Sequence, residues 1–508
     1  MQRERNAKLS TYSIQTFGCQ MNYSDSERMA AYLDGLGLIC TDNIEETDLL
    51  ILNTCSVKQK AEDKVNGFVN NIRLKSKKKD LVIVLTGCIA RRVWNDNKKV
   101  TNSFQRSHEE RVKELEKIFP KVDIFIETKD FVSLGEKLGI TIKYHDKPEH
   151  YLSFKPKYKN KFQAFVPIST GCNHFCTFCI VPYSRGKEVC RPAEEIIREV
   201  FELIRNGYKD ITLLGQTVNR WINPDLKAEF EYDEAQTKIK GLNKERLNNI
   251  EIKKWKVFFE DKSRNENLEN IKNIDLKMPR DFLQLIQVID QIPGEWWTTW
   301  LSSHPSYITD ELIDFMGKSV KEGHQRPYLH FALQSGSDSQ LKRMNRRHSF
   351  EEFYSIVKKI NSKVENLNLS TDIIVGFIGE SEEDFQNTLN AQKVCNFDMI
   401  YISEYSPRIG TAAERLKETV PNEIKSQRKD ELNDLLRGMA RKKNQKFLNS
   451  TQKVLVDGLD RKGKYLTGKT KHNKEVRILE SKDKKIIGEF INVKINKTEA
   501  WWIEGDII

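Results

Sequence analysis

Three apolar segments in the first ninety residues each end close to a cysteine, and this arrangement constrains the fold more than any other feature of the 508-residue chain. The segments are residues 11–17 (TYSIQTF), 48–53 (DLLILN) and 81–86 (LVIVLT). Their β-branched residues and the helix-like stretches between them are typical of an open parallel α/β sheet. Because neighbouring parallel strands end at one shared edge of such a sheet, we expect Cys19, Cys55 and Cys88 to converge there.

A second α/β series begins near residue 165 and predicts six strands with intervening helices. These strands are expected at residues 165–169, 211–214, 298–301, 328–333, 369–375 and 399–405. Six units favour a partial, open barrel over a closed (β/α)8 barrel. After a predicted helix over 422–448, short alternating segments indicate a small β-barrel, with strands at 451–457, 476–479, 490–495 and 501–503. The predicted fold class is therefore α/β: an N-terminal doubly wound parallel domain, a central partial (β/α)6 barrel and a C-terminal small β-barrel.

Composition narrows the classes of protein to which the chain can belong. No apolar run reaches the roughly 18 to 20 residues of a membrane-spanning helix, and residues 1–10 are charged, so we expect a cytoplasmic protein without a membrane anchor. Nine cysteines, an odd number in a reducing compartment, do not fit a disulfide framework and indicate metal ligation or catalysis. The net charge is +11, and about +9 of it lies between residues 437 and 508. This basic C-terminus indicates either a polyanion contact or a lysine-rich accessory surface.

The segment 169–186 (STGCNHFCTFCIVPYSRG) places Cys172, Cys176 and Cys179 in a C-x3-C-x2-C pattern directly after a predicted strand. A structural zinc site usually has four protein ligands, and an electron-transfer cluster is usually held by four cysteines. Three thiolates instead leave one iron open for a small molecule to chelate. Cys190 could in principle be a fourth ligand, but its distance along the chain favours an ordinary cysteine.

The remaining cysteines divide by their position. Cys19, Cys55 and Cys88, taken singly, would be ordinary buried cysteines, but their common place at three strand ends indicates a second metal site. Cys40 and Cys395 have no such placement, so we interpret both as core cysteines.

Taken together, these segments resemble one family. The cysteine loop resembles the signature of the radical S-adenosylmethionine (SAM) superfamily, and nearly the whole chain resembles the methylthiotransferases within it. The resemblance is carried by QTFGCQMN (15–22), NTCSV (53–57), TGC with Ala90, GCNHFCTFCIVPYSRGKEVCRP (171–192), LLGQTVN (213–219), LQSGS (333–337), MNRRHS (344–349), STDIIVGFIGESEEDF (370–385) and YSPRIGTAA (405–413). It is nearest to the branch that acts on N6-isopentenyladenosine beside the tRNA anticodon. Cys190 and Ile378 stand where the family usually has Ser and Pro, and neither change removes a ligand.

The resemblance implies three domains. Residues 10–150 would form the N-terminal methylthiotransferase domain, 158–445 the radical SAM domain and 446–508 a TRAM-like RNA-binding domain. Two insertions interrupt the family pattern, at 93–110 and at 225–280. The second carries 25 charged residues in 56, which indicates either a solvated surface excursion or an additional grip on RNA.

The resemblance also implies cofactors and site residues. Cys172, Cys176 and Cys179 would hold a [4Fe–4S] cluster that binds SAM, and Cys19, Cys55 and Cys88 would hold a second [4Fe–4S] cluster; all six would be catalytic through these clusters. Five residues are candidate SAM contacts, with structural hydrogen bonding as the alternative role: Gln216, Gln334, Ser335, Asp372 and Gly376, with Gly379 as a further candidate. Three arginines are candidate RNA or substrate contacts, with salt bridges as the alternative: Arg185, Arg191 and Arg408.

The implied reaction is the transfer of a methylthio group to C2 of N6-isopentenyladenosine at position 37 of tRNA, with one SAM used for methylation and one for the radical. The adenine must leave its stack to react, as enzymes that act on bases generally require. The expected partners are the tRNA anticodon stem-loop, an external electron donor and a sulfur donor, with the protein acting as a monomer. Alternatives are methylthiolation of threonylcarbamoyladenosine or of a ribosomal protein, and a two-cluster electron carrier that binds RNA, although a carrier gains nothing from open irons.

Overall fold

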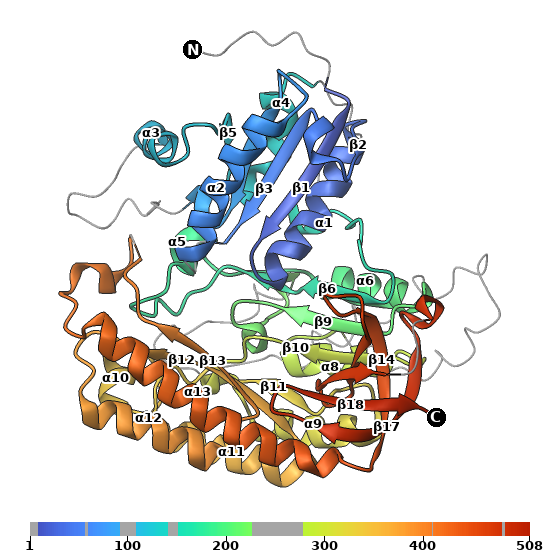
Figure 1. Ribbon diagram of the computed structural model, residues 1–508, viewed down its shortest axis with the longest axis vertical. Coiled ribbons are helices and arrows are strands. Elements are labelled where there is room, and N and C mark those ends of the chain that lie inside the picture. Colours follow the sequence, from blue (N-terminus) through green and yellow to red (C-terminus); the bar gives the residue numbers. More distant parts are fainter. Residues whose placement is uncertain are drawn as a thin grey trace. The chain divides into compact units, whose positions relative to one another are not determined.

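The computed structural model describes residues 9–55, 59–91, 108–140, 151–225, 278–408, 410–479 and 483–508 (Figure 1). The chain divides into two compact units, which are described separately below. Unit 1 comprises residues 1–159, 169–189 and 407–415, and unit 2 comprises residues 160–168, 190–406 and 416–508. The two insertions predicted at 93–110 and 225–280 lie almost wholly outside the described residues.

Unit 1 is built on a five-stranded parallel sheet with the strand order β2-β1-β3-β4-β5. The strands are β1 (Thr11–Phe17), β2 (Ile39–Cys40), β3 (Leu49–Thr54), β4 (Val82–Gly87) and β5 (Ile124–Phe125). Every residue of β3 and β4 is buried, as expected for central strands covered on both faces. Alternate residues of these strands enter two separate hydrophobic clusters, one with helix α1 (Gln20–Gly35) and one with helix α2 (Gln59–Lys75). The predicted doubly wound sheet is confirmed.

Several short elements complete unit 1. They are α3 (His108–Ile118), α4 (Leu134–Lys137), α5 (Val181–Ser184), β7 (Ser169–Thr170) and the 3-10 turns η1 (Ile44–Glu46), η2 (Ile89–Arg91), η3 (Thr128–Ser133), η4 (Tyr151–Ser153) and η9 (Ala412–Arg415). Strand β7 pairs with β8 (Val189–Cys190), and α5 packs against η2. The segment that carries the C-x3-C-x2-C pattern therefore belongs to the same compact unit as the N-terminal sheet.

Unit 2 contains six parallel strands in two three-stranded sheets, β10-β9-β6 and β11-β12-β13. The strands are β6 (Gln163–Pro167), β9 (Asp210–Leu214), β10 (Trp297–Trp300), β11 (Tyr328–His330), β12 (Asn368–Val375) and β13 (Met399–Glu404). Isolated parallel bridges from Thr298 to Gln325 and from Ser303 to Phe331 connect the two sheets next to β10 and β11. The six strands thus follow one another as in the predicted partial (β/α)6 barrel.

Helices cover these strands, and several begin at residues suited to helix starts. Ser349 and Glu352 form a capping box at α11, and Ser381 and Asp384 form another at α12. The helices and 3-10 turns are α6 (Ala193–Arg205), η5 (Val218–Arg220), α8 (Phe282–Ile289), η8 (Pro305–Tyr307), α9 (Asp310–Glu322), α10 (Asp338–Arg343), α11 (Phe350–Lys363), α12 (Glu382–Cys395) and α13 (Asn422–Asn444). Within the described parts of the chain, no helix combines the length and the apolar character needed to cross a bilayer.

The C-terminal strands close into a small barrel in the order β14-β15-β16-β18-β17. They are β14 (Thr451–Leu459), β15 (Leu466–Thr470), β16 (Glu475–Ile478), β17 (Phe490–Thr498) and β18 (Trp502–Ile507), accompanied by η10 (Gln445–Phe447) and η11 (Lys484–Ile486). The prediction missed β15, because Leu466 is its only large apolar residue. The predicted helix over 422–448 ends earlier, at Asn444.

Within unit 2, the turn between β15 and β16 of the small barrel contacts the open barrel. The Asn368 side-chain amide donates to the His472 carbonyl (2.6 Å), and the Lys471 ammonium donates to the Val320 carbonyl (2.9 Å). The buried Asp398 carboxylate lies between two ammonium groups, those of Lys443 and Lys474, the latter at 2.8 Å. Part of the positive charge of the C-terminus therefore holds the fold together.

Candidate functional site

The cysteines that follow β1, β3 and β4 meet at the carboxyl edge of the N-terminal sheet. The Cys55 N–H donates to the Phe17 carbonyl (2.9 Å), and the Cys88 N–H donates to the Thr54 carbonyl (2.7 Å), so both residues continue the parallel register beyond their strands. Cys19 is the N-cap of α1, directly after β1. The convergence expected from the sequence is observed.

Glycines precede two of these cysteines because the backbone there leaves no room for a side chain. Gly87 has a φ of +88°, and a Cβ atom on it would lie 2.3 Å from the Thr54 carbonyl oxygen. A Cβ on Gly18 would lie 2.1 Å from the Asn22 Oδ1 atom. The glycine of TGC thus reflects close packing against the end of β3, and the glycine of TFGC reflects close packing against the first turn of α1.

A buried polar network holds the first turn of α1 against β3. The Asn22 side-chain amide donates to Asn53 Oδ1 (3.0 Å), and the Asn53 amide donates to Ser26 Oγ (2.9 Å) and to the Asn22 carbonyl (2.8 Å). The Cys19 N–H donates to Asn22 Oδ1 (3.2 Å). Because these asparagines flank Cys19 and Cys55, the network fixes the backbone from which both thiols project.

One arginine from the cysteine loop reaches this edge of the sheet. The Arg185 guanidinium donates through Nη2 to the Asp25 carboxylate of α1 (2.7 Å), and the two side chains are 5% and 0% exposed. The Tyr151 hydroxyl donates to the other oxygen of Asp25 (3.3 Å). The positive charge of Arg185 also acts on the thiols of Cys19 and Cys88. A buried cation therefore lies near two of the three cysteines, Cys19 and Cys88.

The electrostatics of this site favour a thiolate at one position. A hydrogen bond with the Cys55 thiol lowers the pKa of Cys88 to about 6, and the charge of Arg185 acts in the same direction, whereas burial opposes both. Since the thiolate is the form that binds metals, Cys88 is predisposed to act as a ligand at neutral pH.

The C-x3-C-x2-C loop is shaped by its own backbone contacts. Gly171 has a φ of +80°, and a Cβ on it would lie 2.2 Å from the Lys187 carbonyl oxygen. The Cys172 N–H donates to the Gly186 carbonyl (3.1 Å), and the Cys179 N–H donates to the Cys176 carbonyl (2.9 Å). Cys172 is buried, whereas Cys176 and Cys179 are half-buried. The loop folds back on itself and presents three sulfur atoms within a few residues.

The donor set of each triplet fits an iron–sulfur cluster. All nine cysteines are free thiols. Among the described residues, no three His, Cys, Asp or Glu side chains are grouped closely enough to hold a single metal ion. A cubane cluster takes one thiolate on each iron, so three thiols per site satisfy three irons and leave the fourth without a protein ligand.

The five candidate SAM contacts all belong to unit 2; four of them follow the carboxyl ends of its strands, whereas Asp372 lies within β12. The Gln216 Oε1 atom is buried and has no hydrogen-bond partner in the described structure, so it is available to a ligand. Gln334 has a φ of +77°, and its N–H donates to the Asp372 carbonyl (2.9 Å). Ser335 is engaged inside the fold, 3.3 Å from the Thr388 hydroxyl.

The other two candidates differ in their surroundings. The Asp372 carboxylate is partly exposed and lies 3.3 Å from Nε2 of His330, and the ring of His330 neighbours that of Tyr401. Gly376 has a φ of +69°, and its N–H donates to the Glu380 carboxylate (2.6 Å). Gly379 lines a pocket of about 600 Å³ at the starts of α10, α11 and α12.

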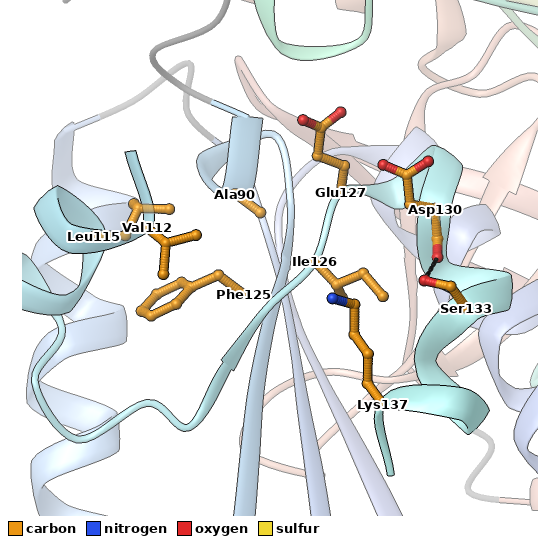
Figure 2. A pocket seen from close by; sticks show the side chains of 9 residues that line it. All are labelled: Ala90, Val112, Leu115, Phe125, Ile126, Glu127, Asp130, Ser133 and Lys137. Atoms are coloured by element: carbon orange, nitrogen blue, oxygen red, sulfur yellow. Dashed lines mark hydrogen bonds between the residues drawn. The ribbon is translucent and has the colours of Figure 1, made fainter. Parts of the chain in front are cut away.

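A smaller pocket of about 160 Å³ lies in unit 1 beside η2 (Figure 2). One of its lining residues, Ala90, stands two positions after Cys88 in the chain. Its lining consists of Ala90, Val112, Leu115, Phe125, Ile126, Glu127, Asp130, Ser133 and Lys137. Figure 2 shows apolar side chains on one side and the carboxylates of Glu127 and Asp130 on the other. Ala90, which is part of the family pattern, is the contribution of the cysteine segment to this pocket.

The structure revises several minor predictions. Arg185 and Arg191 are buried and paired with carboxylates, Arg191 with Glu199 at 2.7 Å, which does not support an RNA contact for either. Arg408 is half-buried. Cys40 is exposed on the edge strand β2, so its interpretation as a core cysteine is wrong. Cys190 and Cys395 are buried, as expected for ordinary cysteines.

Sequence reasoning missed Asp25, His330 and Tyr401 as neighbours of the candidate sites. A signal for Asp25 exists, because it follows Cys19 and Asn22 at three-residue intervals and so belongs to the same face of α1. His330 and Tyr401 carry no comparable signal, since they come from strands separated by about seventy residues.

Comparisons with known families match most of the chain. Residues 166–391 match the radical SAM superfamily, residues 11–106 match the uncharacterized protein family UPF0004, and residues 445–508 match the TRAM domain.

Full-length relatives carry one common name. The chain is 33% identical to a tRNA-2-methylthio-N(6)-dimethylallyladenosine synthase of Caldicellulosiruptor saccharolyticus, a match that covers 99% of this chain and 94% of that protein. It is 34% identical to a synthase of the same name from Clostridium botulinum, covering 98% and 97%. Among solved structures, the radical SAM methyltransferase TsrM from Kitasatospora setae aligns with a TM-score of 0.41 and 12% identity, covering 78% of this chain and 75% of that one.

Proposed function

Because the chain belongs to the radical SAM methylthiotransferase family, we propose that it transfers a methylthio group to C2 of N6-isopentenyladenosine at position 37 of tRNA. One molecule of SAM serves the methylation and another serves the radical step. The observation that carries the proposal is the meeting of Cys19, Cys55 and Cys88 at one sheet edge, in the same compact unit as the C-x3-C-x2-C loop. An enzyme that both activates a C–H bond and delivers sulfur needs two such sites.

The cofactors are SAM and two [4Fe–4S] clusters, and each triplet of cysteines has a separate task. Cys172, Cys176 and Cys179 would hold the cluster that binds SAM, and Cys19, Cys55 and Cys88 would hold the second. When bound, the first supplies one-electron cleavage of SAM to a hydrogen-abstracting radical, and the second supplies the sulfur. The protein's own part is to hold the thiolates, exclude water and orient the adenine.

The chain's remaining residues would bind SAM and the base. Gln216 offers a buried, unused acceptor, and Asp372 offers a carboxylate oriented by His330. Gln334, Ser335 and Gly376 would act through the backbone around them. The exposed ring of Tyr401 beside His330 offers a face on which an extruded base can stack.

The small barrel would hold the tRNA. The Arg477 guanidinium lies 4.0 Å from the centre of the Trp502 ring, the Lys497 ammonium lies 5.0 Å from it, and the neighbouring Trp501 is exposed. Cations interleaved with indole rings suit phosphates and stacked bases. We assign residues 10–150, 158–445 and 446–508 to the three domains. The partners would be the anticodon stem-loop, an electron donor and a sulfur donor, with the protein acting as a monomer in the cytoplasm.

Nucleoside mass spectrometry tests the reaction and the substrate together. The chain is expressed in cells stripped of their own methylthiolating enzymes, and tRNA is digested and analysed. We expect 2-methylthio-N6-isopentenyladenosine. A methylthiolated threonylcarbamoyladenosine instead would contradict the substrate, and the absence of any methylthio product from a protein with intact clusters would contradict tRNA methylthiolation itself.

Single cysteine variants test the division of labour between the two sites. Cys172→Ala should abolish SAM cleavage, measured as 5′-deoxyadenosine, whereas Cys19→Ala should spare cleavage and stop sulfur insertion. Cys40→Ala, which removes an exposed cysteine outside both sites, is the matched control and should change neither. Equal loss of cleavage in Cys172→Ala and Cys19→Ala, each with its remaining cluster intact, would refute separate tasks.

A further inference from the structure

Arg185 connects the two cysteine triplets. It follows α5, which follows Cys179 almost directly in the chain, and its side chain reaches Asp25 on the helix that begins next to Cys19. The residues that meet here are 160 positions apart in sequence. The same side chain therefore anchors the C-x3-C-x2-C loop and lies beside the other triplet.

The guanidinium keeps an unused hydrogen-bond donor at this place. Asp25 takes one N–H of Nη2, whereas the buried Nη1 atom has no hydrogen-bond partner among the described residues. A guanidinium has five N–H donors, and a buried donor without an acceptor is costly. An acceptor that arrives with a ligand would remove this cost.

The ligand must be small and anionic. The Arg185 side chain is only 5% exposed, so an RNA phosphate cannot approach it without unfolding the surroundings. The charge of Arg185 acts on the thiols of Cys19 and Cys88, and its side chain also hydrogen-bonds with Cys88. A sulfur anion next to metal-bound thiolates is the small anion that fits these surroundings.

We propose that Arg185 is a positioning residue that donates its free N–H to the sulfur anion, hydrosulfide or methanethiolate, carried at the Cys19–Cys55–Cys88 site. The inference rests on the proposed function, since it requires an iron site at this triplet. Asp25 fixes the guanidinium in place, and no covalent bond to Arg185 forms. A cation beside an anionic cluster also favours its reduction, because reduction adds negative charge.

The test isolates the second site. In a Cys172→Ala, Cys176→Ala, Cys179→Ala background, the reconstituted protein can hold iron only at the other triplet. The midpoint potential and the affinity for hydrosulfide, added as sodium sulfide, are measured by electron paramagnetic resonance for the parent, Arg185→Gln and Arg185→Lys. Arg191→Gln is the matched control, because Arg191 is equally buried and ion-paired, and its sequence neighbour Cys190 belongs to neither triplet.

We expect Arg185→Gln to weaken hydrosulfide binding at least tenfold and to lower the midpoint potential. Arg185→Lys keeps the charge without the planar fork, so it should retain the potential and lose part of the affinity. Arg191→Gln should match the parent in both. Parent-like affinity and potential in Arg185→Gln would overturn the inference. So would an Arg185→Lys variant that loses both as fully as Arg185→Gln does.

The outcomes separate this inference from the function on which it rests. A parent that assembles no iron at the second triplet would contradict the proposed function and the inference together. A parent that assembles iron and binds hydrosulfide, with an affinity independent of Arg185, would overturn only the inference.

Discussion

Asp25 in unit 1 and Asp398 in unit 2 are both buried carboxylates paired with cations from distant parts of the sequence, yet their surroundings differ. Asp398 receives two ammonium groups, from Lys443 and Lys474, and the Leu369 N–H (3.1 Å). Asp25 receives one guanidinium, from Arg185, which keeps a free N–H beside cysteines.

The difference separates two uses of a buried charge. At Asp398 the charged groups satisfy one another, and the result is a fixed contact between the open barrel and the small barrel. At Asp25 the guanidinium of Arg185 is held by the carboxylate but keeps a buried N–H without an acceptor, so it can bind a ligand there. The burial and the charges of the two sites are similar and do not distinguish them. The hydrogen-bond partners of each polar atom distinguish them.

The largest effect should come from breaking the complete site. Asp398→Ala leaves two buried ammonium groups without a carboxylate, which should cost about 3 to 5 kcal/mol of local stability. Native-state hydrogen exchange over residues 451–508 measures this loss. Glu404→Ala, which removes a half-exposed partner of Lys429, is the control and should cost less than about 1 kcal/mol. Equal losses would show that the Asp398 contact is not a special anchor.

Asp25→Asn should behave differently with and without clusters. In the cluster-free protein it leaves Arg185 buried without its carboxylate, at a cost of about 3 kcal/mol. An anionic cluster beside Arg185 would replace part of the lost charge, so the loss in the reconstituted protein should be smaller. Anaerobic thermal unfolding of both forms gives the two values, and Asp398→Ala should show no such dependence on cluster loading. The same loss in both forms of Asp25→Asn would contradict the distinction drawn between the sites.

Acid should weaken the docking contact through His472. Burial, aided by the charge of Lys446, lowers the pKa of His472 to about 4. The unfolded chain binds a proton near pH 6.5 but the folded protein does not until about pH 4, so stability is full above pH 6.5 and falls as the pH drops from 6.5 to 4. Between pH 6.5 and pH 4, the free energy of unfolding should fall by about 2 to 3 kcal/mol.

His472→Gln tests this pH dependence. The Asp398 carboxylate, which pairs with Lys474, has a lowered pKa and so keeps its charge over this window. In the variant, the free energy of opening of the small barrel, measured by hydrogen exchange at several pH values, should therefore no longer change between pH 6.5 and 4.5. A slope that persists would assign the effect to another group.

The smallest effect should come from an exposed pair. The Lys359 ammonium lies 2.7 Å from the Asp310 carboxylate, but both side chains are more than half exposed. Lys359→Ala should change stability by less than about 1 kcal/mol and lose even this difference at high salt. A cost comparable with that of Asp398→Ala would show that burial does not separate the two classes of pair.

The sequence predicted the features that depend on local patterns. The strands before Cys19, Cys55 and Cys88 were found to within one residue, because apolar periodicity and the position of a residue after a strand are properties of a short segment. The order of parallel strands then follows from general rules, which is why the meeting of the cysteines was predictable.

The features that escaped prediction depend on pairing between distant segments. Arg185 was predicted to contact RNA or substrate or to form a salt bridge, and the basic C-terminus to contact a polyanion or to form a lysine-rich surface, because composition reports a charge but not its partner. Strand β15 was not predicted, because it is stabilised mainly by pairing with β14 and β16 and its own residues show little of the pattern of a strand. The ligand assignments of the six cysteines and of the SAM contacts stay predictions until clusters are bound.

The turn between β15 and β16 has one further consequence. Because Lys471, His472 and Lys474 fasten this turn to the strands and helices of the open barrel, the surface around Trp502 stands at a set distance from the ends of β9 to β13. Under the proposed function, in which the small barrel holds the tRNA, this fixed spacing sets the distance between the bound stem and the reacting base. An anticodon arm lengthened by one base pair should then present the wrong nucleotide, even when its loop sequence is unchanged.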